Sequence, residues 1–483
     1  MGIQKDGGNG MNNITDALKG LGYTTINETW YDLVEGWRSW YKGSVAKFHN
    51  YRVWTGQKFV PCSRYSLGMA KKICEDWANL LMNERVKITL EGDKEQAFID
   101  EVFTANDFEI NMNELQEKGA ALGTYAVVPR MTKVAVNEAG EIVNGGQIAL
   151  DYITADHIFP LSWVGRDIKE CAFATVINSE GKSYLYMQLH TLVNGKYQIT
   201  NVIYAINNGQ LAAAKFTDVK GWENVSDKPI ITGSTEPQFV IGRYNITNNV
   251  EEDNPMGIAV YANAIDTIKG IDITYDSYVN EFLLGKKRIM VKPSATKRLD
   301  GEDVFDPNDC VFYVLPEDVT DGTVIKEIDM TLRTEEHTQG LQDQLNLLSS
   351  KCGFGERHYK FDGGNVSTAT QIISENSEMF RTIKKHEIVL ESLLTELCRI
   401  LLRMGNQYLN KGLDVDVEIS IDFDDSIIID KAQEEARVYQ MLSAGLMRAD
   451  EARSLLMNED IETARAALPG MEDLTTEGQD DVE

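Results

Sequence analysis

STATQIISENSEMFRTIKKHEIVLESLLTELCRILLRM, residues 367–404, carries the pattern of one long helix. Thr368 and Gln371 form a capping box, in which two side chains satisfy amide groups that a helix start leaves unpaired. The pattern predicts a helix of about 37 residues, roughly 55 Å long at 1.5 Å per residue, that ends at Gly405 or Gly412. Its apolar residues recur at helical spacing and form one stripe: Met379, Ile383, Leu390, Leu393, Leu397, Ile400 and Met404.

A loop flanked by glycines, GFGERHYKFDGGNV at residues 353–366, comes directly before this helix. Glycines adopt backbone angles that other residues resist, so we expect the loop to be flexible. Its few basic groups nearly balance its acidic groups, which suits transient contact with phosphate better than tight binding. A helix of this length exceeds what a compact domain needs. The two features together predict a spanning strut or subunit contact that presents a flexible loop.

The composition describes a large, acidic chain. Its 483 residues are enough for about three or four domains, and 47 basic residues against 75 acidic residues give a net charge of -28. Proteins that hold nucleic acid by its phosphates carry the opposite charge. The chain therefore either avoids DNA or lets DNA pass close by without binding it.

Several sequence signals are absent. The six cysteines, at positions 62, 74, 171, 310, 352 and 398, include no CxxC pair and are typical of reduced, buried thiols. The start MGIQKDGGNG lacks the basic and apolar regions of a secretory signal, and Asp6 stands where a myristoylation motif needs Ser or Thr. No uncharged apolar run approaches the length of about 18 residues that spans a bilayer. We expect no contact with a membrane.

The first half of the chain reads as an α+β block. Its glycine-rich first ten residues predict disorder. A helix is predicted at residues 66–83, a strand at 84–90 and a further helical stretch from Glu95 toward Gly123. Strands dominate residues 124–208, where Asn194-Gly195 and the turn at 179–181 mark hairpins.

Three helices and a small β module organise the second half. Asn254 as cap and Pro255 at the first helical position predict a helix that reaches Gly285, with Asp272 interrupting its apolar stripe. Short strands at 288–292, 310–315 and 324–328 follow, and then a helix at about 334–350. After the long helix, a half-buried strand is predicted at 414–423, helical structure at 431–468 with a break near Gly445, and a disordered acidic tail at 471–483.

No stretch carries a complete catalytic or metal-binding motif. Gly181-Lys182-Ser183 lies in a hairpin turn with Val176 where a phosphate loop needs glycine, so we expect no nucleotide site. The acids Asp422, Asp424 and Asp425 have no glycine and later glutamate to complete an EF-hand. The histidines stand apart, without HExxH or a serine or cysteine elbow. We therefore expect no enzyme activity, no cofactor and no metal.

Four stretches, taken together and in this order, resemble the portal proteins of tailed bacteriophages, in particular those of siphoviral phages of Gram-positive hosts. They are YSLGMAKKICEDWANLLMNERVKI at 65–88, IDITYDSYVNEFLLGKKRIMV at 271–291, STATQIISENSEMFRTIKKHE at 367–387 and IDFDDSIIIDKAQE at 421–434. The resemblance implies an α+β portal-protein fold with an α/β wing, two stem helices, a small β-containing clip, a long wing helix and a helical crown.

The resemblance also assigns these parts to residues. It implies an N-terminal arm at 1–39, the first part of the wing at 40–253, stem helices at 254–285 and 334–352, the clip at 286–333, a tunnel loop at 353–366, the long wing helix and strand at 367–430, the crown at 431–470 and a tail at 471–483. The region assigned to the crown is shorter than in the family, so its size and detail stay open.

By the same resemblance the protein is a virion component, assembled in the host cytoplasm as a ring of about twelve copies at one capsid vertex. Genomic double-stranded DNA is packaged and ejected through this ring without regard to its sequence. The implied partners are other copies of the chain, the terminase large subunit, a head-completion or neck protein, and the major capsid and scaffolding proteins.

Two sets of site residues follow from this assignment. The implied channel residues of the tunnel loop are Gly353, Gly355, Arg357, His358, Lys360, Gly363 and Gly364. The implied docking residues of the clip are Lys286, Lys287, Arg288, Lys292, Lys297 and Arg298. Two other classes stay open: a capsid-associated structural protein that is not a portal, and a metal-dependent hydrolase that uses the acids at 422–425.

Overall fold

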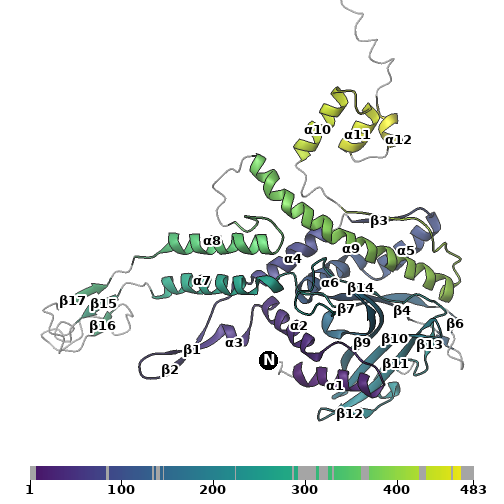
Figure 1. Ribbon diagram of the computed structural model, residues 1–483, viewed down its shortest axis with the longest axis horizontal. Helices are drawn as coiled ribbons and strands as arrows, with labels where there is room; N and C mark the ends of the chain where they lie inside the picture. Colours follow the sequence, from purple (N-terminus) through teal and green to yellow (C-terminus); the bar gives the residue numbers. More distant parts are fainter. Residues whose placement is uncertain are drawn as a thin grey trace, which may run out of the picture. The chain divides into compact units, whose positions relative to one another are not determined.

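Helix α9 (Ala369–Leu409) is the long helix that the sequence predicts, and it spans 41 residues in the computed structural model of the chain (Figure 1). It continues through Gly405, where a Cβ would lie 2.7 Å from Cζ of Phe98. The helix ends where Asn410 and Gly412 take positive φ angles of 51° and 64°. The predicted stop at Gly405 is therefore wrong, because this glycine serves close packing inside the helix.

The described residues fall into two compact units, Met1–Asp422 and Phe423–Glu483. None of the described helices contains an apolar stretch long enough to cross a membrane. The structure describes residues 7–468 except 83–85, 133–134, 137–141, 145, 223–224, 285–287, 292–311, 315–324, 329–330, 361–368, 424–430 and 458–460.

The helical part of the first unit's core is built from α4 (Met69–Leu81), α5 (Asp93–Ala105) and α6 (Phe108–Leu122). Residues at helical spacing bury one face of each helix, for example Ile73 and Trp77 in α4 and Met112 in α6. The single helical stretch predicted from Glu95 is divided in two, because Asp107 takes a φ of 46°. Left-handed backbone of this kind ends a helix.

Helices α1 (Gly7–Gly20), α2 (Glu28–Tyr41) and α3 (Ala46–His49) precede this core. Asn27 caps α2, since its side chain accepts a hydrogen bond of 3.1 Å from the amide of Thr29. Leu18 of α1 and Trp30 of α2 are completely buried. The prediction of disorder for the first ten residues is wrong for residues 7–10, which belong to α1.

The larger sheet has the order β12-β11-β10-β9-β8, with β13 also paired to β11. Both predicted hairpins are confirmed: Asn194-Gly195 joins β10 to β11 with φ angles of 53° and 76°, and Glu180-Gly181 joins β9 to β10 with 51° and 79°. Its strands are β8 (Ile158–Val164), β9 (Asp167–Ser179), β10 (Lys182–Val193), β11 (Lys196–Asn207), β12 (Gln210–Ala213) and β13 (Ile230–Ile231).

A second sheet has the order β14-β4-β7, formed by β14 (Val240–Gly242), β4 (Tyr125–Thr132) and β7 (Gln147–Thr154). Tyr125 lies at its centre and is 2% exposed. Two glycines make room for its ring: a Cβ on Gly119 of α6 would lie 2.4 Å from the ring, and one on Gly242 would lie 2.0 Å away. The tyrosine thus locks α6 onto the sheet.

The smaller strand pairs are each antiparallel. They are β1 (Asn50–Trp54) with β2 (Phe59–Ser63), β5 (Ala135–Val136) with β6 (Ile142–Asn144), and β3 (Lys87–Leu90) with β18 (Ile419–Asp422). The strand predicted at residues 414–423 is therefore only four residues long. Its alternating sequence continues further than its pairing partner, which ends at Leu90 opposite Ile419.

Helix α7 (Ile265–Leu284) starts ten residues later than the sequence predicts, after the turn of 3-10 helix at Ala262–Ala264. Asn254 does accept a hydrogen bond from the amide of Met256, as a cap would. No helix follows, because the chain next runs irregularly through the core, where Gly257 approaches the backbone oxygen of Gly123. Tertiary packing overrides the cap signal. Helix α8 (Thr334–Lys351) matches its prediction.

The unit from Phe423 to Glu483 contains α10 (Lys431–Ser443), α11 (Ala449–Met457) and α12 (Ile461–Ala466). The predicted break is confirmed at Gly445, which takes a φ of 69°. Buried Asp450 joins α11 to α12, because Nε of Arg465 donates to it at 2.9 Å. Hydrogen bonds from Arg448 and Arg465 hold the pKa of Asp450 far below its usual value.

The contact between Tyr125 and Gly119 yields a stability prediction. Gly119→Ala should lower the free energy of unfolding by about 1–3 kcal/mol, because the added Cβ overpacks a buried ring. Gly36→Ala is the matched control: it is also a helical glycine, but a Cβ there meets nothing within 4 Å. The control should be neutral or stabilise by up to about 1 kcal/mol. Thermal unfolding checks both, and equal melting temperatures would contradict the packing argument.

Candidate functional site

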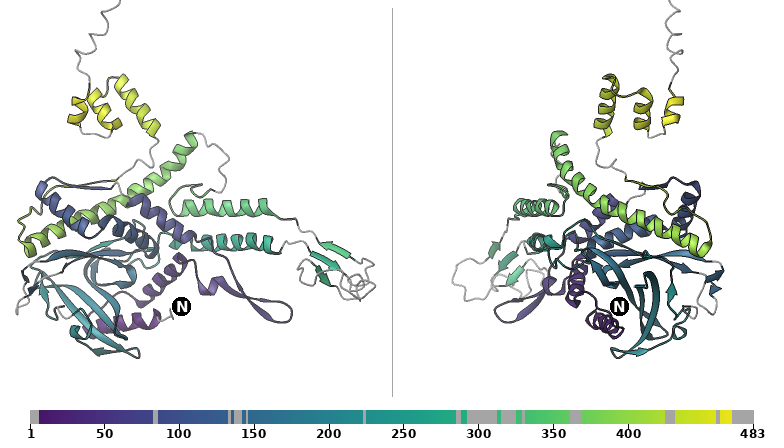
Figure 2. Two further views of the ribbon diagram at one scale, coloured as in Figure 1. Left: turned by 180° about the vertical axis from the view of Figure 1, so that it is seen from behind. Right: turned by 45° about the vertical axis from the view of Figure 1, so that its right-hand side comes forward.

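Helices α7 and α8 lie side by side in each view of the molecule (Figures 1 and 2). Nε2 of Gln344 donates to Oγ1 of Thr274 at 3.0 Å, and Nζ of Lys351 donates to Oγ1 of Thr267 at 3.1 Å. Gly270 lets the helices approach, because a Cβ there would lie 2.7 Å from Oε1 of Gln344. Hydrogen bonds and close packing therefore hold α7 and α8 together at the end nearest the core.

An ion-pair cluster joins the two helices at their other end. Glu281 of α7 accepts hydrogen bonds from Nε and Nη2 of Arg333 at 3.1 and 2.9 Å. Nε2 of His337 lies 3.6 Å from the same carboxylate. The hydrogen bonds from Arg333 lower the pKa of Glu281 to about 2, so the carboxylate is ionised at neutral pH. This ion pair links the last turns of α7 to the start of α8.

A three-stranded sheet lies between the two helices in the sequence. Strand β15 (Arg288–Val291) is central, parallel to β16 (Phe312–Val314) and antiparallel to β17 (Ile325–Ile328). Arg288 begins the central strand, and it is the only predicted docking residue with a described backbone. Lys286, Lys287, Lys292, Lys297 and Arg298 lie outside the described residues.

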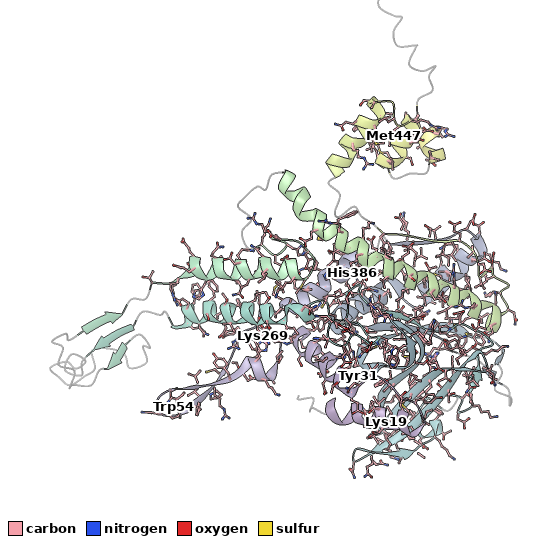
Figure 3. All side chains as sticks on the ribbon, in the orientation of Figure 1. Lys19, Tyr31, Trp54, Lys269, His386 and Met447 are labelled. Atoms are coloured by element: carbon pink, nitrogen blue, oxygen red, sulfur yellow. The ribbon has the colours of Figure 1, made fainter. Side chains whose placement is uncertain are left out.

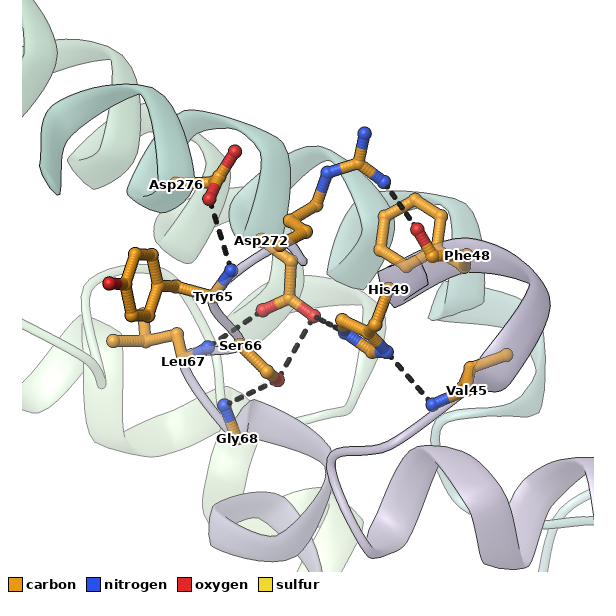
Figure 4. Close-up of polar contacts among 10 residues, drawn as sticks. Val45, Phe48, His49, Tyr65, Ser66, Leu67, Gly68, Asp272 and Asp276 are labelled. Carbon is orange, nitrogen blue, oxygen red and sulfur yellow. Dashed lines mark hydrogen bonds and ion pairs between the residues drawn. The ribbon is translucent and has the colours of Figure 1, made fainter. Parts of the chain in front are cut away.

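Asp272, the acid that interrupts the apolar stripe of α7, anchors the chain segment that leads into α4 (Figure 4). Its side chain is fully buried. It accepts hydrogen bonds from the amide of Leu67 at 2.8 Å and from Oγ of Ser66 at 3.1 Å, and Nε2 of His49 lies 3.1 Å away. The sequence shows only that an acid stands in an apolar stripe; its partners are more than 200 positions away along the chain.

Asp276, one helical turn later, extends this anchor. It accepts a hydrogen bond of 3.1 Å from the amide of Tyr65. Next to Tyr65, Nη1 of Arg64 donates to the carbonyl of Phe48 at 2.8 Å, and its guanidinium lies 4.4 Å from the centre of the Phe48 ring. The carboxylates of α7 therefore hold the chain at the base of the β1–β2 hairpin, and Arg64 ties the end of β2 to Phe48 just before β1.

The first half of the predicted tunnel loop is anchored to α4. Phe354 is 2% exposed and stacks on Trp77 with 4.7 Å between ring centres. The hydroxyl of Tyr359 donates to Oδ2 of Asp76 at 3.0 Å, and Nε2 of His358 lies 3.5 Å from the same atom. Burial raises the pKa of Asp76, but hydrogen bonds from His358, Lys72 and Tyr359 outweigh it and leave that pKa lowered.

This anchoring corrects the expectation of a flexible loop that starts at Gly353. Glycine at 353 and 355 serves tight turns, with φ angles of 83° and 79°, rather than free movement. Arg357 and Lys360 are exposed at this turn, whereas His358 is held beside Asp76. Gly363 and Gly364 lie outside the described residues. The channel role of the loop stays a prediction.

Trp77 joins three elements. Its Nε1 donates to the carbonyl of Cys352 at the end of α8, at 3.2 Å. His386 of α9 packs edge-on against it, with 4.8 Å between ring centres, and Nδ1 of this histidine accepts a hydrogen bond from the amide of Asn245 at 3.0 Å. Burial lowers the pKa of His386 to about 3, so the ring stays neutral and can accept that bond. Helices α4, α8 and α9 thus share one buried junction.

The described residues show no arrangement for metal binding. No three His, Cys, Asp or Glu side chains among them lie together as ligands would. The cysteines of the described core are free, and burial raises the pKa of the Cys74 and Cys398 thiols, which leaves them protonated. Asp422 ends β18, whereas Asp424 and Asp425 lie outside the described residues.

The anchor on α7 yields a second prediction. Asp272→Ala leaves buried donors at Leu67 and Ser66 without an acceptor, so it should lower the free energy of unfolding by about 1–3 kcal/mol. It should also make residues 50–64 more sensitive to limited proteolysis. Asp266→Ala on the same helix is the control, since that side chain is 91% exposed, and it should change stability by less than about 0.5 kcal/mol. Equal cleavage in both variants would contradict the anchoring role.

A family model places the chain among known proteins. The family described as "Phage portal protein, SPP1 Gp6-like" matches residues 23–468. No curated protein matches the chain. Similar solved structures include the neck of a native GTA particle, computed with C12 symmetry (11% identity, 80% of this chain and 90% of that chain, TM-score 0.36). The virion of a native gene transfer agent (GTA) particle (11%, 80% and 88%, 0.38) and the neck of an empty GTA particle, computed with C6 symmetry (10%, 80% and 88%, 0.36), are also similar.

Proposed function

The chain belongs to the SPP1 Gp6-like family of phage portal proteins, and we propose that its copies form a ring of about twelve around a central channel at one capsid vertex. Genomic double-stranded DNA is packaged and later ejected through this channel. The observation that carries the proposal is the family match, which extends over residues 23–468 and so includes almost every element described above.

The charge of the chain supports a channel that DNA passes without being held. With 75 acidic and 47 basic residues, the net charge of each copy is -28. A ring of such copies repels the phosphate backbone over most of its surface. Each strong contact between a basic side chain and a phosphate would release counterions and slow the passage of DNA. An acidic wall with few basic groups keeps the DNA mobile.

We propose that only the second part of the tunnel loop contacts DNA, whereas the sequence suggests the whole loop. Residues 353–360 are fixed on Trp77 and Asp76, so they position the loop. We assign the adjustable contact with DNA to residues 361–366, which lie outside the described residues and contain Gly363 and Gly364. The exposed groups of Arg357 and Lys360 directly precede this segment in the chain.

The β15–β17 sheet between the stem helices is the docking end. We propose that it binds the terminase large subunit during packaging and a head-completion or neck protein afterwards. The helix pair supports this proposal, because the ion pair of Glu281 and Arg333 joins α7 and α8 at the end where the chain enters and leaves the sheet. The major capsid and scaffolding proteins would contact the larger α/β part, and assembly takes place in the host cytoplasm.

The ring itself is the first test. Purified protein at micromolar concentration should form rings of uniform size with a central opening, seen in electron-microscopic class averages and in light scattering. The family match and the coupled helix pair lead to this expectation. Only monomers, across low and high salt and up to high protein concentration, would refute the proposed function. Filaments without a closed ring would instead favour a capsid-associated protein that is not a portal.

The docking end is the second test. Replacing Lys286, Lys287 and Arg288 together by Glu should leave the ring intact and weaken binding of terminase or neck protein by about tenfold, because reversed charge adds repulsion against an acidic partner. The matched control replaces three exposed lysines by Glu, namely Lys182 and Lys196 of the large sheet and Lys220 in the segment between β12 and β13. Pull-down of both partners measures the effect. Equal losses in the two triple variants, or none in either, would count against the assignment.

A further inference from the structure

The β1–β2 hairpin is exposed along its whole length. None of its ten strand residues is buried. Val53, Trp54 and Phe59 are 44%, 55% and 63% exposed, and the rings of Trp54 and Phe59 lie 5.1 Å apart. Trp54 lies at the outer end of the hairpin, away from the core (Figure 3). Large apolar side chains in such a position indicate a surface that binds something.

An isolated two-stranded hairpin is only marginally stable in water. In this structure β1 and β2 pair with each other and with no third described strand, so both strands also present free backbone edges. Yet the base of the hairpin is fixed, by Asp272 and Asp276 on one side and Arg64 on the other. Two buried carboxylates hold the base of a hairpin whose strand residues are all exposed or only partly buried. An arm that is fixed at its base and exposed beyond it is suited to contact another molecule.

The charge of the hairpin indicates the chemistry of that molecule. Residues 50–64 contain Arg52, Lys58 and Arg64 and no acidic residue, in a chain with 75 acidic against 47 basic residues. The hairpin is therefore a basic and aromatic surface on an acidic protein. A second copy of the same chain supplies the opposite charge and is present at every step of assembly.

Helix α8 carries a surface that complements the hairpin. Residues at helical spacing along it form one exposed stripe with two acids and a leucine: Glu336, Gln339, Asp343, Leu347 and Ser350. Leu347 is 52% exposed. The stretch from Glu336 to Leu347 is about 17 Å long at 1.5 Å per residue, and a strand of five residues has the same length of about 17 Å.

The positions of the two surfaces suit a ring. Helix α7 lies between α8 and the hairpin (Figures 1 and 2), with α8 bonded to it through Gln344 and the base of the hairpin through Asp272. The hairpin and the α8 stripe are thus on opposite sides of one copy. Complementary surfaces on opposite sides make a head-to-tail contact, which repeats around a closed ring.

We propose that the β1–β2 hairpin of one copy docks on the α8 stripe of a second copy. Trp54 and Phe59 pack together on Leu347, and Arg52 and Lys58 face Glu336 and Asp343. This inference rests on the proposed function for the ring, and adds to it the surface through which neighbouring copies recognise each other. The contact also covers the apolar residues that a single copy leaves in water.

Charge reversal tests the contact. Arg52→Glu with Lys58→Glu, and separately Glu336→Lys with Asp343→Lys, should each raise the concentration for half-maximal ring assembly by about tenfold. All four changes in one chain should restore assembly, because the reversed hairpin then meets a reversed stripe. Lys182→Glu with Lys196→Glu, in the large sheet, is the matched control and should have little effect. Mass photometry over a concentration series measures the rings, and circular dichroism checks folding.

Cross-linking tests the same contact without relying on charge. In a Cys62→Ser background, Trp54→Cys protein mixed with Leu347→Cys protein should form a disulfide-linked dimer under mild oxidation. Neither variant alone should do so. A cysteine at Val164, which is 73% exposed on the large sheet, is the control partner and should not cross-link to position 54.

The outcomes separate this inference from the proposed function. If rings form but all hairpin and stripe variants assemble normally and no cross-link appears, the inference is wrong and the ring stands. If unmodified protein forms no ring, the proposed function fails first. The remaining class of partner is nucleic acid: if Arg52→Glu with Lys58→Glu abolishes binding of a short DNA duplex and leaves assembly unchanged, the hairpin is a DNA-contacting surface and the inference is overturned.

Discussion

Two carboxylates on α7 accept hydrogen bonds from the chain that leads into α4, and the arrangement of the first unit depends on this contact. The chain between the β1–β2 hairpin and α4 runs without secondary structure, so its backbone amides need partners outside the segment. Asp272 and Asp276 supply them, at 2.8 Å to the amide of Leu67 and 3.1 Å to that of Tyr65. Because a buried carboxylate without donors would be costly, the two sides require each other. The same contact sets the position of α7, the start of α4 and the direction of the hairpin.

The effect of that anchor reaches α8 and α9 through α4. Trp77, two turns into α4, hydrogen-bonds the carbonyl of Cys352 and packs on Phe354 and His386. The turn that follows α8 is therefore tied to the helix that α7 positions. The buried contacts of Trp77 thus connect α4, the end of α8 and α9 within one compact unit.

The net charge of the chain and the local charge of the β1–β2 hairpin have opposite signs and different consequences for recognition. The net charge of -28 opposes tight binding to the phosphates of DNA and favours repulsion between copies. Assembly of the proposed ring would then depend on local exceptions to this charge. The hairpin at residues 50–64 is such an exception, since it carries basic and aromatic side chains only a short distance from an acidic helix pair. The repulsion between copies also favours the contact in which these local charges are matched.

The sequence alone determined the elements whose stabilising contacts are local. The stripe of α9, the positive-φ pairs at 180–181 and 194–195, and helix α8 all follow from spacing or from single turns. The resemblance in four ordered stretches was enough to indicate the portal family. It could not test which residues touch DNA or a partner, and most of the predicted clip residues lie outside the described structure.

Tertiary structure decided the points at which a local signal meets a distant neighbour. Asn254 has a cap's hydrogen bond but no helix, because Gly257 must pass Gly123. Gly405 stays helical because Phe98 occupies the space a side chain would need. The glycines at 353 and 355 suggest flexibility, whereas Phe354 between them is buried on Trp77. In each case the partner lies far away in the sequence, and its contact energy exceeds the preference of the local residues.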